Sequence, residues 1–187
     1  MKPDGDPALL ETRAEIFRLA RICAPSLDQL GKLTFQGNPS NTTIRRVWRD
    51  TVLVPVLAPA LESAWLAGKA GFRELLGADA ALEARLATSM TPGSRAAGRQ
   101  MAAAFHAPAG ETGLLKFREA ILRGETPGHM AILFAGRAAV FHFPRPLVLP
   151  ALVFAEMREV RVAELWTLID DCIAPVVQAG STGLRAA

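Results

Sequence analysis

The sequence predicts a mainly α-helical, single-domain helical bundle, and three observations support that fold class. Half of the 187 residues are hydrophobic, which is enough for one sizeable core. Apolar residues recur at helical spacing in most segments of the chain. Prolines and glycines separate these segments and supply the signals that begin and end helices. We expect one helical domain over residues 8–178, with a flexible N-terminus at 1–7 and a flexible C-terminal tail at 179–187.

The first helix is expected to follow Asp6-Pro7, where a capping aspartate precedes a first-turn proline, and to end at Ala24-Pro25. A loop rich in glycine, asparagine and proline comes next. A second helix is expected over residues 43–66. Pro55 and Pro59 should kink or divide that helix, because each removes a backbone donor from its interior.

Two short helices are expected after it, Phe72–Leu76 and Asp79–Thr88, with Asp79 capping the second. The triplet Thr-Pro-Gly then occurs twice, at residues 91–93 and 126–128. In each triplet the threonine hydroxyl can satisfy a backbone amide at a helix start, and the proline already holds a helical φ. We therefore expect a helix to follow each triplet.

Residues 129–143 fit two structures. The upstream triplet favours a helix that would be buried nearly all round, whereas the run Val140–Phe143 favours a strand. The helix is our prediction, and one short β-hairpin near 131–143 is the alternative. On either side we expect an amphipathic helix over Thr112–Arg123 and a final helix or helix pair over Leu152–Ile173.

Side chains that usually carry chemistry are scarce. The chain has three histidines, two cysteines and no tyrosine. Cys23 and Cys172 are far apart in sequence, lack metal-ligand spacing, and are expected to be reduced, buried thiols. Nucleophilic, acid–base and transition-metal chemistry draw mainly on these residue types. We therefore predict no catalytic residue, no metal site and no cofactor, and a function of interaction rather than catalysis.

A partner-binding surface is predicted from arginines and tryptophans, because these residue types dominate the energetics of interfaces. Arg45, Arg46 and Arg49 flank Trp48 on one expected helix, and Arg95 and Arg99 form an i,i+4 pair on another. The predicted contact residues are Arg45, Trp48, Arg49, Arg95, Arg99 and Trp166. The alternative for each arginine is a solvated helix face, and for each tryptophan it is the core.

Two other functions are kept as alternatives. A small-molecule-binding protein or enzyme would enclose an apolar pocket, in which His129 and His142 supply polarity beside Phe134 and Phe141. A DNA-binding regulator would need convergent basic residues, such as the first arginine group. The net charge of +3 is mild and the arginines are dispersed, so a nucleic-acid partner is not favoured.

The compartment is predicted from two further segments. The most apolar stretch, His129–Phe154, is interrupted by glycine, arginine and proline, so we expect no membrane-spanning helix. The polar Met1–Pro7 precedes no apolar run of the kind found in signal peptides. We therefore expect a cytoplasmic protein without a membrane partner.

Four runs of sequence carry a resemblance to a known family: Leu57-Ala58-Pro59-Ala60-Leu61, Leu82–Ser89, Ser94–Met101 and Gly128–Gly136. In their order, from Val54 to Phe143, they resemble UreF, a family of all-helical urease accessory proteins that assist nickel insertion. UreF proteins have a helix with a comparable Arg…Gly…Gln face. Another of their helices begins near a His-Ala pair and is rich in small residues.

Residues 45–50 and 72–77 are also similar to helical partner proteins that serve iron-dependent peptide-modifying enzymes. Both resemblances imply the same broad role. We predict a non-catalytic accessory or adaptor protein that binds a partner enzyme or precursor during its maturation, in metalloenzyme assembly or in peptide modification. The expected partner is another protein, and a homodimer is a further expectation.

Overall fold

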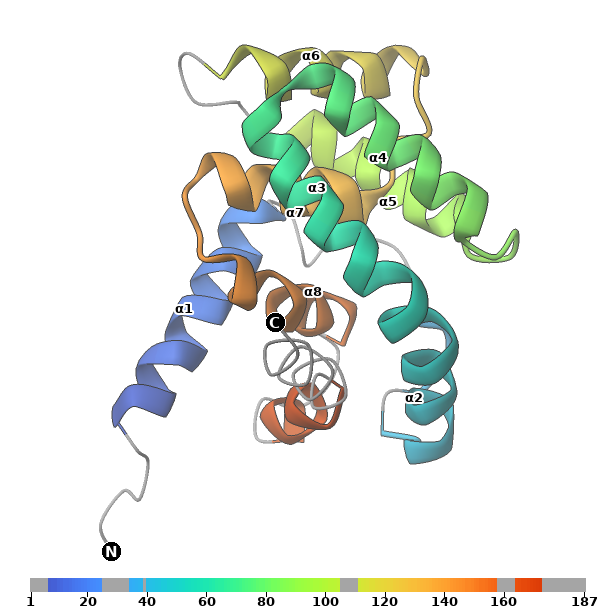
Figure 1. Cartoon of the computed structure of the whole chain (residues 1–187). Coiled ribbons are helices and arrows are strands. Elements are labelled where there is room, and N and C mark those ends of the chain that lie inside the picture. The colour runs from blue at the N-terminus through green and yellow to red at the C-terminus, as the bar shows by residue number, and fades with distance from the viewer. Residues whose placement is uncertain (1–6, 25–33, 39, 105–110, 158–163, 173–187) are drawn as a thin grey trace, which may run out of the picture.

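The computed structural model describes residues 7–24, 34–38, 40–104, 111–157 and 164–172 (Figure 1). Within these residues the regular elements are all helical, as predicted, and no strand is present. The elements in chain order are α1 (Pro7–Cys23), α2 (Thr42–Trp48), the π-helical η2 (Arg49–Leu57), α3 (Ala58–Ala70), α4 (Phe72–Arg85), α5 (Thr91–Ala104), α6 (Thr112–Arg123), α7 (Met130–Val140), the 3-10 helix η3 (Arg145–Leu147) and α8 (Val148–Glu156). A further helix covers residues 164–172.

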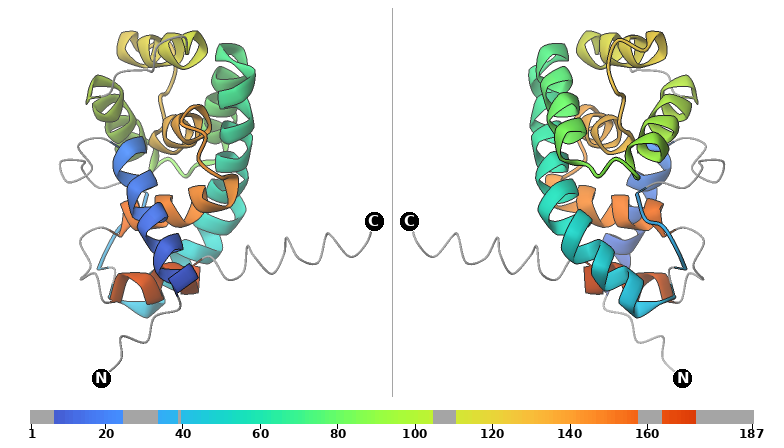
Figure 2. Two further views of the ribbon diagram at one scale, coloured as in Figure 1. Left: turned by 90° about the vertical axis from the view of Figure 1, so that its left-hand side faces the viewer. Right: turned by 90° about the vertical axis from the view of Figure 1, so that its right-hand side faces the viewer.

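Helix α7 lies at the centre of the bundle. Figure 2 shows it nearly end-on in the middle of the molecule, with the other helices around it. Every residue from Met130 to Val140 is buried. Apart from Arg137 this helix is apolar on all sides, and such a helix needs a central position because any exposed face would leave apolar side chains in water. The predicted helix is therefore confirmed, and the alternative hairpin is wrong for this segment.

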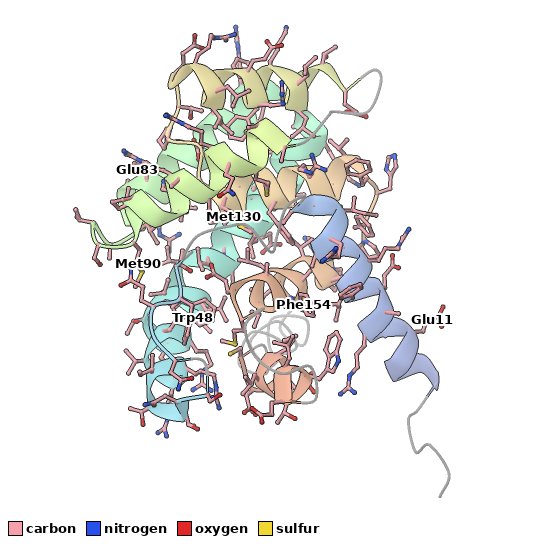
Figure 3. All side chains as sticks on the ribbon, turned by 180° about the vertical axis from the view of Figure 1, so that it is seen from behind. Glu11, Trp48, Glu83, Met90, Met130 and Phe154 are labelled. Carbon is pink, nitrogen blue, oxygen red and sulfur yellow. The ribbon has the colours of Figure 1, made fainter. Side chains whose placement is uncertain are left out.

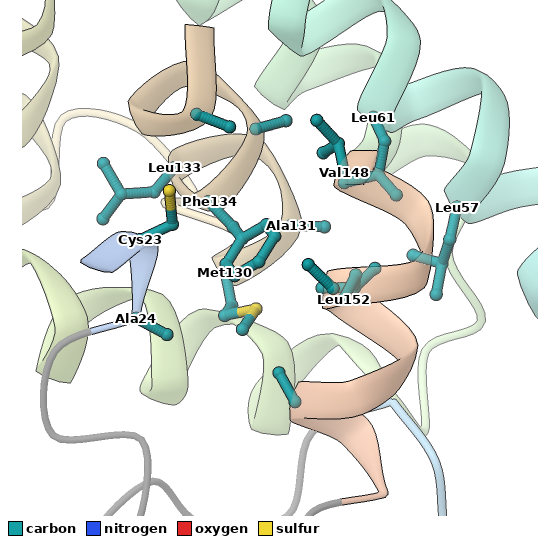
Figure 4. Close-up of a cluster of buried hydrophobic side chains, with 14 of the residues drawn as sticks. Cys23, Ala24, Leu57, Leu61, Met130, Ala131, Leu133, Phe134, Val148 and Leu152 are labelled. Carbon is teal, nitrogen blue, oxygen red and sulfur yellow. The ribbon is translucent and has the colours of Figure 1, made fainter. Parts of the chain in front are cut away.

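One cluster of buried hydrophobic side chains fills the interior. It draws residues from α1 through α8 and from the helix at 164–172. Figure 4 shows the middle of this cluster. There Met130 and Phe134 of α7 lie between Cys23 of α1 on one side and Leu57 of η2 and Leu61 of α3 on the other. Contacts spread over so many elements bind the described segments into one core.

Gly68 allows α3 to cross α7 at close range. A Cβ atom at Gly68 would lie 2.8 Å from the carbonyl oxygen of Gly136. No real Cβ approaches backbone so closely, so this crossing requires glycine. The sequence predicts that this helix ends near Leu66, and that prediction is wrong because the contact of Gly68 with α7 lies within the helix. It continues through Gly68 and ends at Ala70, one residue before Gly71.

The two prolines of the second helix change its hydrogen bonding rather than its continuity. Pro55 lies inside the π-helical turn η2, and the N–H of Ala58 bonds to the carbonyl of Leu53, five residues back. Pro59 cannot donate to the carbonyl of Pro55, four residues before it. The Arg85 side chain of α4 donates to that carbonyl instead, at 2.5 Å. The predicted kink is thus a local π-helical segment supported from a neighbouring helix.

The continuous helix Thr42–Ala70 is 29 residues long and has the length and composition to cross a membrane. This helix lies upstream of the apolar stretch His129–Phe154, from which no spanning helix is expected. Core helices of soluble proteins meet the same criteria. This one buries Leu53, Leu57 and Leu61 in the central cluster, while Val47 and Leu66 stay exposed.

Helix α4 differs from its prediction. The expected pair Phe72–Leu76 and Asp79–Thr88 is one continuous helix, Phe72–Arg85. Gly77 lies between the two expected helices, and a Cβ atom added there would meet nothing within 4 Å. Asp79 is therefore a residue of the helix interior, and it is fully buried.

The helices nearest the two ends of the chain can be compared with their predicted limits. Helix α1 begins at Pro7 and ends at Cys23, close to its predicted limits. The final helix is a pair, α8 and residues 164–172, and α8 begins at Val148 with Pro150 in its first turn. Apart from Pro7, the predicted flexible ends 1–7 and 179–187 lie outside the described residues.

Candidate functional site

A carboxylate from another helix fixes the start of α7. Asp79 of α4 accepts hydrogen bonds at Oδ2 from the Thr126 hydroxyl, 2.6 Å away, and from the Gly128 amide, 2.7 Å away. Its Oδ1 accepts from the His129 amide at 2.9 Å. The negative charge of Asp79 is favourable beside the N-terminus of α7, which is the positive end of the helix dipole. The prediction that Asp79 caps a helix beginning at its own position is therefore wrong, and its carboxylate instead binds the start of a helix far along the chain.

The threonines of the two triplets have other partners than predicted. The Thr126 hydroxyl donates to Asp79 rather than accepting from an amide of its own helix. The Thr91 hydroxyl lies 3.2 Å from the carbonyl oxygen of Ala87 and donates to it. The prediction that each hydroxyl satisfies a helix-start amide is therefore wrong, although a helix does follow or include each triplet.

The His129 ring is completely buried, and both of its nitrogens have partners. Nε2 lies 2.7 Å from Oε2 of Glu83, and Nδ1 lies 3.1 Å from the Ser94 hydroxyl oxygen. An ionised carboxylate only accepts, so Nε2 carries a proton and donates to Glu83. In the neutral ring Nδ1 then accepts from Ser94. The ring is held between α4 and α5 and has no remaining polar atom for a ligand.

Arg95 of α5 closes this arrangement. Its Nε lies 3.0 Å from Oε2 of Glu83, and its Nη2 bonds Oε1 of the same carboxylate. The hydrogen bond from Arg95, and after it the contact with His129, lowers the pKa of Glu83 below its ordinary value, although partial burial opposes this. We call Asp79, Glu83, Ser94, Arg95, Thr126 and His129 the α7 network. Figure 3 shows Glu83 at the face where α4 and α5 meet.

Gly98 brings α5 against the turn that precedes α7. A Cβ atom at Gly98 would lie 1.9 Å from the carbonyl oxygen of Gly128 and 2.8 Å from the amide nitrogen of Met130. Only glycine fits at this contact. Because the face of α5 beside Gly98 carries Arg95 and Arg99, the close approach places both arginines next to residues 124–127.

An open depression of about 800 Å³ runs between α5 and that turn. We call it the α5 groove, and it is lined by Pro92, Arg95, Ala96, Arg99, Gln100, Ala103, Gly124, Glu125, Thr126 and Pro127. Its walls combine small apolar side chains with charged ones. Two of the predicted contact residues, Arg95 and Arg99, therefore lie together on one surface.

The other predicted contact residues lie elsewhere. Arg45, Arg46 and Arg49 line a separate depression of about 240 Å³ with Thr42, Asp171 and Cys172. This depression is at the α2 end of the molecule, away from α5 and α6 (Figure 1). Trp48 faces inward and is 4% exposed. Its indole donates to the Thr34 hydroxyl at 3.3 Å, and its ring meets Phe35 edge to face.

Trp166 is half-buried on the helix at 164–172. Its ring packs against Phe154 at 5.9 Å between centroids, and the guanidinium of Arg13 lies 5.3 Å from its centroid. Trp166 thus joins α1 and α8 to the last described helix. The structure does not bring it together with the arginines of the α5 groove.

The residues of the pocket alternative are not brought together. His129 precedes α7 and is buried, whereas His142 follows α7, is exposed, and has a left-handed φ of 59°. Eleven helical residues separate the two histidines. Phe134 is fully buried between them, and Phe141 is half-buried beside Arg137, whose guanidinium lies 5.4 Å from its centroid. A pocket lined by both histidines is therefore wrong.

The two cysteines are buried free thiols, as predicted. Burial raises the pKa of Cys23 to about 12, although the nearby charge of Arg137 opposes this. Burial likewise raises the pKa of Cys172 to about 11. In the described part of the chain, no group of three or more histidine, cysteine or carboxylate side chains could hold a metal ion.

Sequence reasoning missed four members of the α7 network: Asp79 in its real role, Glu83, Ser94 and Thr126. The local signal was the triplet Thr126-Pro127-Gly128, which marks a helix start but predicts that Thr126 itself satisfies it. The partner that satisfies it is 47 to 50 residues away, which local patterns do not reveal.

Comparison with known proteins gives one finding. The model of the UreF family matches residues 45–163, about two-thirds of the chain. The matched region contains α3 to α8, the complete α7 network and the α5 groove. No curated protein and no solved structure matches the chain significantly.

Proposed function

The chain belongs to the UreF family of urease accessory proteins, and from that membership we propose that it binds another urease maturation protein through the α5 groove. The family supports the resemblance to UreF over the resemblance to partners of peptide-modifying enzymes. An accessory role agrees with a chain whose buried histidine and thiols are committed to packing.

The observation that carries this proposal is the groove beside the Gly98 contact, in which exposed Arg99 lies next to small apolar side chains and to Arg95, itself paired with Glu83. Exposed arginine beside apolar surface is the composition typical of interface anchors. The walls belong to α5 and to the turn before α7, which hydrogen bonds of the α7 network tie to α4, so a partner would meet a surface that is already formed. Preformed surfaces lose less conformational entropy on binding than mobile ones.

The remaining parts of the proposal are the compartment and the oligomeric state. We expect the protein to act in the cytoplasm and to form a homodimer. Light scattering of the purified chain measures its mass directly, and a mass of one chain at working concentration would contradict the homodimer. Trp166 and the arginines beside Trp48 stay candidate contacts for a second surface.

Capture of defined partners tests the proposed function. The full chain, carrying an affinity tag, is co-expressed with urease and the other urease accessory proteins of the same genome. We expect at least one of these proteins to co-purify in constant proportion with the chain. Failure of all of them to co-purify, from cells in which each is present and soluble, would contradict the proposal.

A further inference from the structure

We propose that the α5 groove receives an acidic segment of the partner protein, in which one carboxylate pairs with Arg99 and small apolar residues flank it. This inference rests on the proposed function, because it names the chemistry of the partner at the same surface. It follows from which charged side chains of the groove already have a partner in this chain.

Arg95 is already neutralised inside the molecule. Its guanidinium binds both oxygens of Glu83, which in turn holds the His129 ring. An incoming carboxylate would have to displace a paired, preorganised one. Arg95 therefore serves the fold, and of the predicted i,i+4 arginine pair only the second member is available for binding.

Arg99 has no such partner. Within the described residues its exposed side chain makes no ion pair and no side-chain hydrogen bond, and its Nη2 reaches across toward Gly124. The nearest acid of the groove, Glu125, is bound by Arg123 through Nε at 2.6 Å and Nη2 at 2.9 Å. Arg99 is thus the uncompensated charge of the groove, and a planar guanidinium favours bidentate pairing with a carboxylate.

The walls determine what surrounds that carboxylate. Ala96 and Ala103 of α5 face Pro127 across the groove, with Pro92 at one end. These short, stiff side chains leave an open trough rather than a closed cavity. Among the described residues that line this trough, Arg99 is the one cation without an ion pair, which suits a protein segment with a single acidic anchor. Nucleic acid would instead need several basic groups, since each phosphate contact neutralises one charge.

Site-specific photo-crosslinking identifies the occupant. A photoreactive phenylalanine analogue replaces Ala96 in the full chain, which is then co-expressed with the urease proteins as above and irradiated. The matched control carries the analogue at Ala80, an exposed residue on α4 outside the groove. We expect the Ala96 position alone to crosslink, and the crosslinked partner peptide to contain an aspartate or glutamate.

Charge reversal gives the second readout. Arg99→Glu should weaken partner binding about tenfold or more, and lysine at the crosslinked partner carboxylate should restore it. Arg73→Glu on α4 reverses an equally exposed charge outside the groove and should leave binding unchanged.

The outcomes separate the two proposals. If no urease protein co-purifies with the unaltered chain, the proposed function fails. If one co-purifies but Arg99→Glu binds it equally well, the inference alone fails. A crosslink from Ala96 to a peptide without an acidic residue, or to nucleic acid, would likewise overturn the inference.

Discussion

Asp79 shows how one buried charge can organise a helix that is distant in sequence. Its carboxylate is fully buried, yet both oxygens are occupied by donors from the turn before α7. A buried charge without such donors would be strongly unfavourable. The contact ties α4 to the start of the central helix, so we expect the stability of the whole bundle to depend on it.

Asp79→Asn tests that dependence. The amide group of asparagine would place its own N–H donors against the backbone donors of Gly128 or His129, so at least one hydrogen bond is lost. We expect the free energy of unfolding to fall by about 2–4 kcal/mol, as measured by urea denaturation. Glu74→Gln, an exposed change on the same helix, should alter it by less than about 0.5 kcal/mol. Equal effects of the two changes would contradict this role.

The two thiols give a prediction with a defined pH window. Because burial raises the pKa of Cys23 to about 12 and that of Cys172 to about 11, the reactive thiolates form only in strongly alkaline solution. We expect neither cysteine of the folded chain to react with a thiol reagent at pH 8, and both to react in denaturant. Rapid labelling of the folded chain at pH 8 would contradict the burial.

The thiols also affect stability at high pH. The folded state holds these two protons more tightly than the unfolded state, whose thiols titrate near 9. Their contribution to stability is therefore complete below about pH 9 and declines as the pH rises toward 12.

Local patterns predicted individual residues unevenly. Burial of Cys23 and Cys172 followed from the lack of any ligand spacing, and it is confirmed. The role of His129 did not follow, because its partners Glu83 and Ser94 come from two other helices. A single sequence shows that a polar residue near a helix start needs partners, but it does not show which ones.

At the scale of elements, α5 meets the turn before α7 at the shortest distance given for any glycine of the described residues. Gly98→Ala would force a Cβ into the carbonyl of Gly128, at 1.9 Å in the present backbone. We expect a loss of stability of about 2–3 kcal/mol, because backbone on both sides must move. Thermal or urea denaturation measures it.

Gly77→Ala is the matched control for this change. Gly77 also lies within a helix, but a Cβ there would meet nothing within 4 Å. Alanine should therefore stabilise α4 by about 0.5–1 kcal/mol, through helix propensity alone. Opposite signs for the two glycines are the expected result. A stabilising Gly98→Ala would show that α5 does not lie against the turn as described.

Most helices could be predicted because their signals are local. The proline at the start of α1, the αL glycine after α6 and the apolar run of α7 each fix an element by itself. The π-helical turn could not be predicted, since it depends on Arg85 of another helix supplying a donor to Pro55. The break expected between Leu76 and Asp79 is absent, and Leu75 and Leu82 on either side of it are both buried in the core.

At the scale of the molecule, the fold class and the family were accessible from sequence, whereas the site was accessible only in part. The order of apolar helices and the runs around Gly98 and Gly128 resemble UreF, and the family match confirms the resemblance. The α5 groove depends on the close contact between Gly98 of α5 and Gly128 of the turn before α7. Only the structure shows that Arg95 is paired with Glu83, whereas Arg99 makes no ion pair with a described residue.

The nickel content of urease tests the account most directly. In the native organism the gene for this chain is deleted, and urease is purified from cells complemented with the unaltered chain, with Arg99→Glu or with Arg73→Glu. We predict that urease from the deletion strain lacks nickel, that the unaltered chain and Arg73→Glu restore it, and that Arg99→Glu restores little. Fully nickel-loaded urease in the deletion strain would contradict the account.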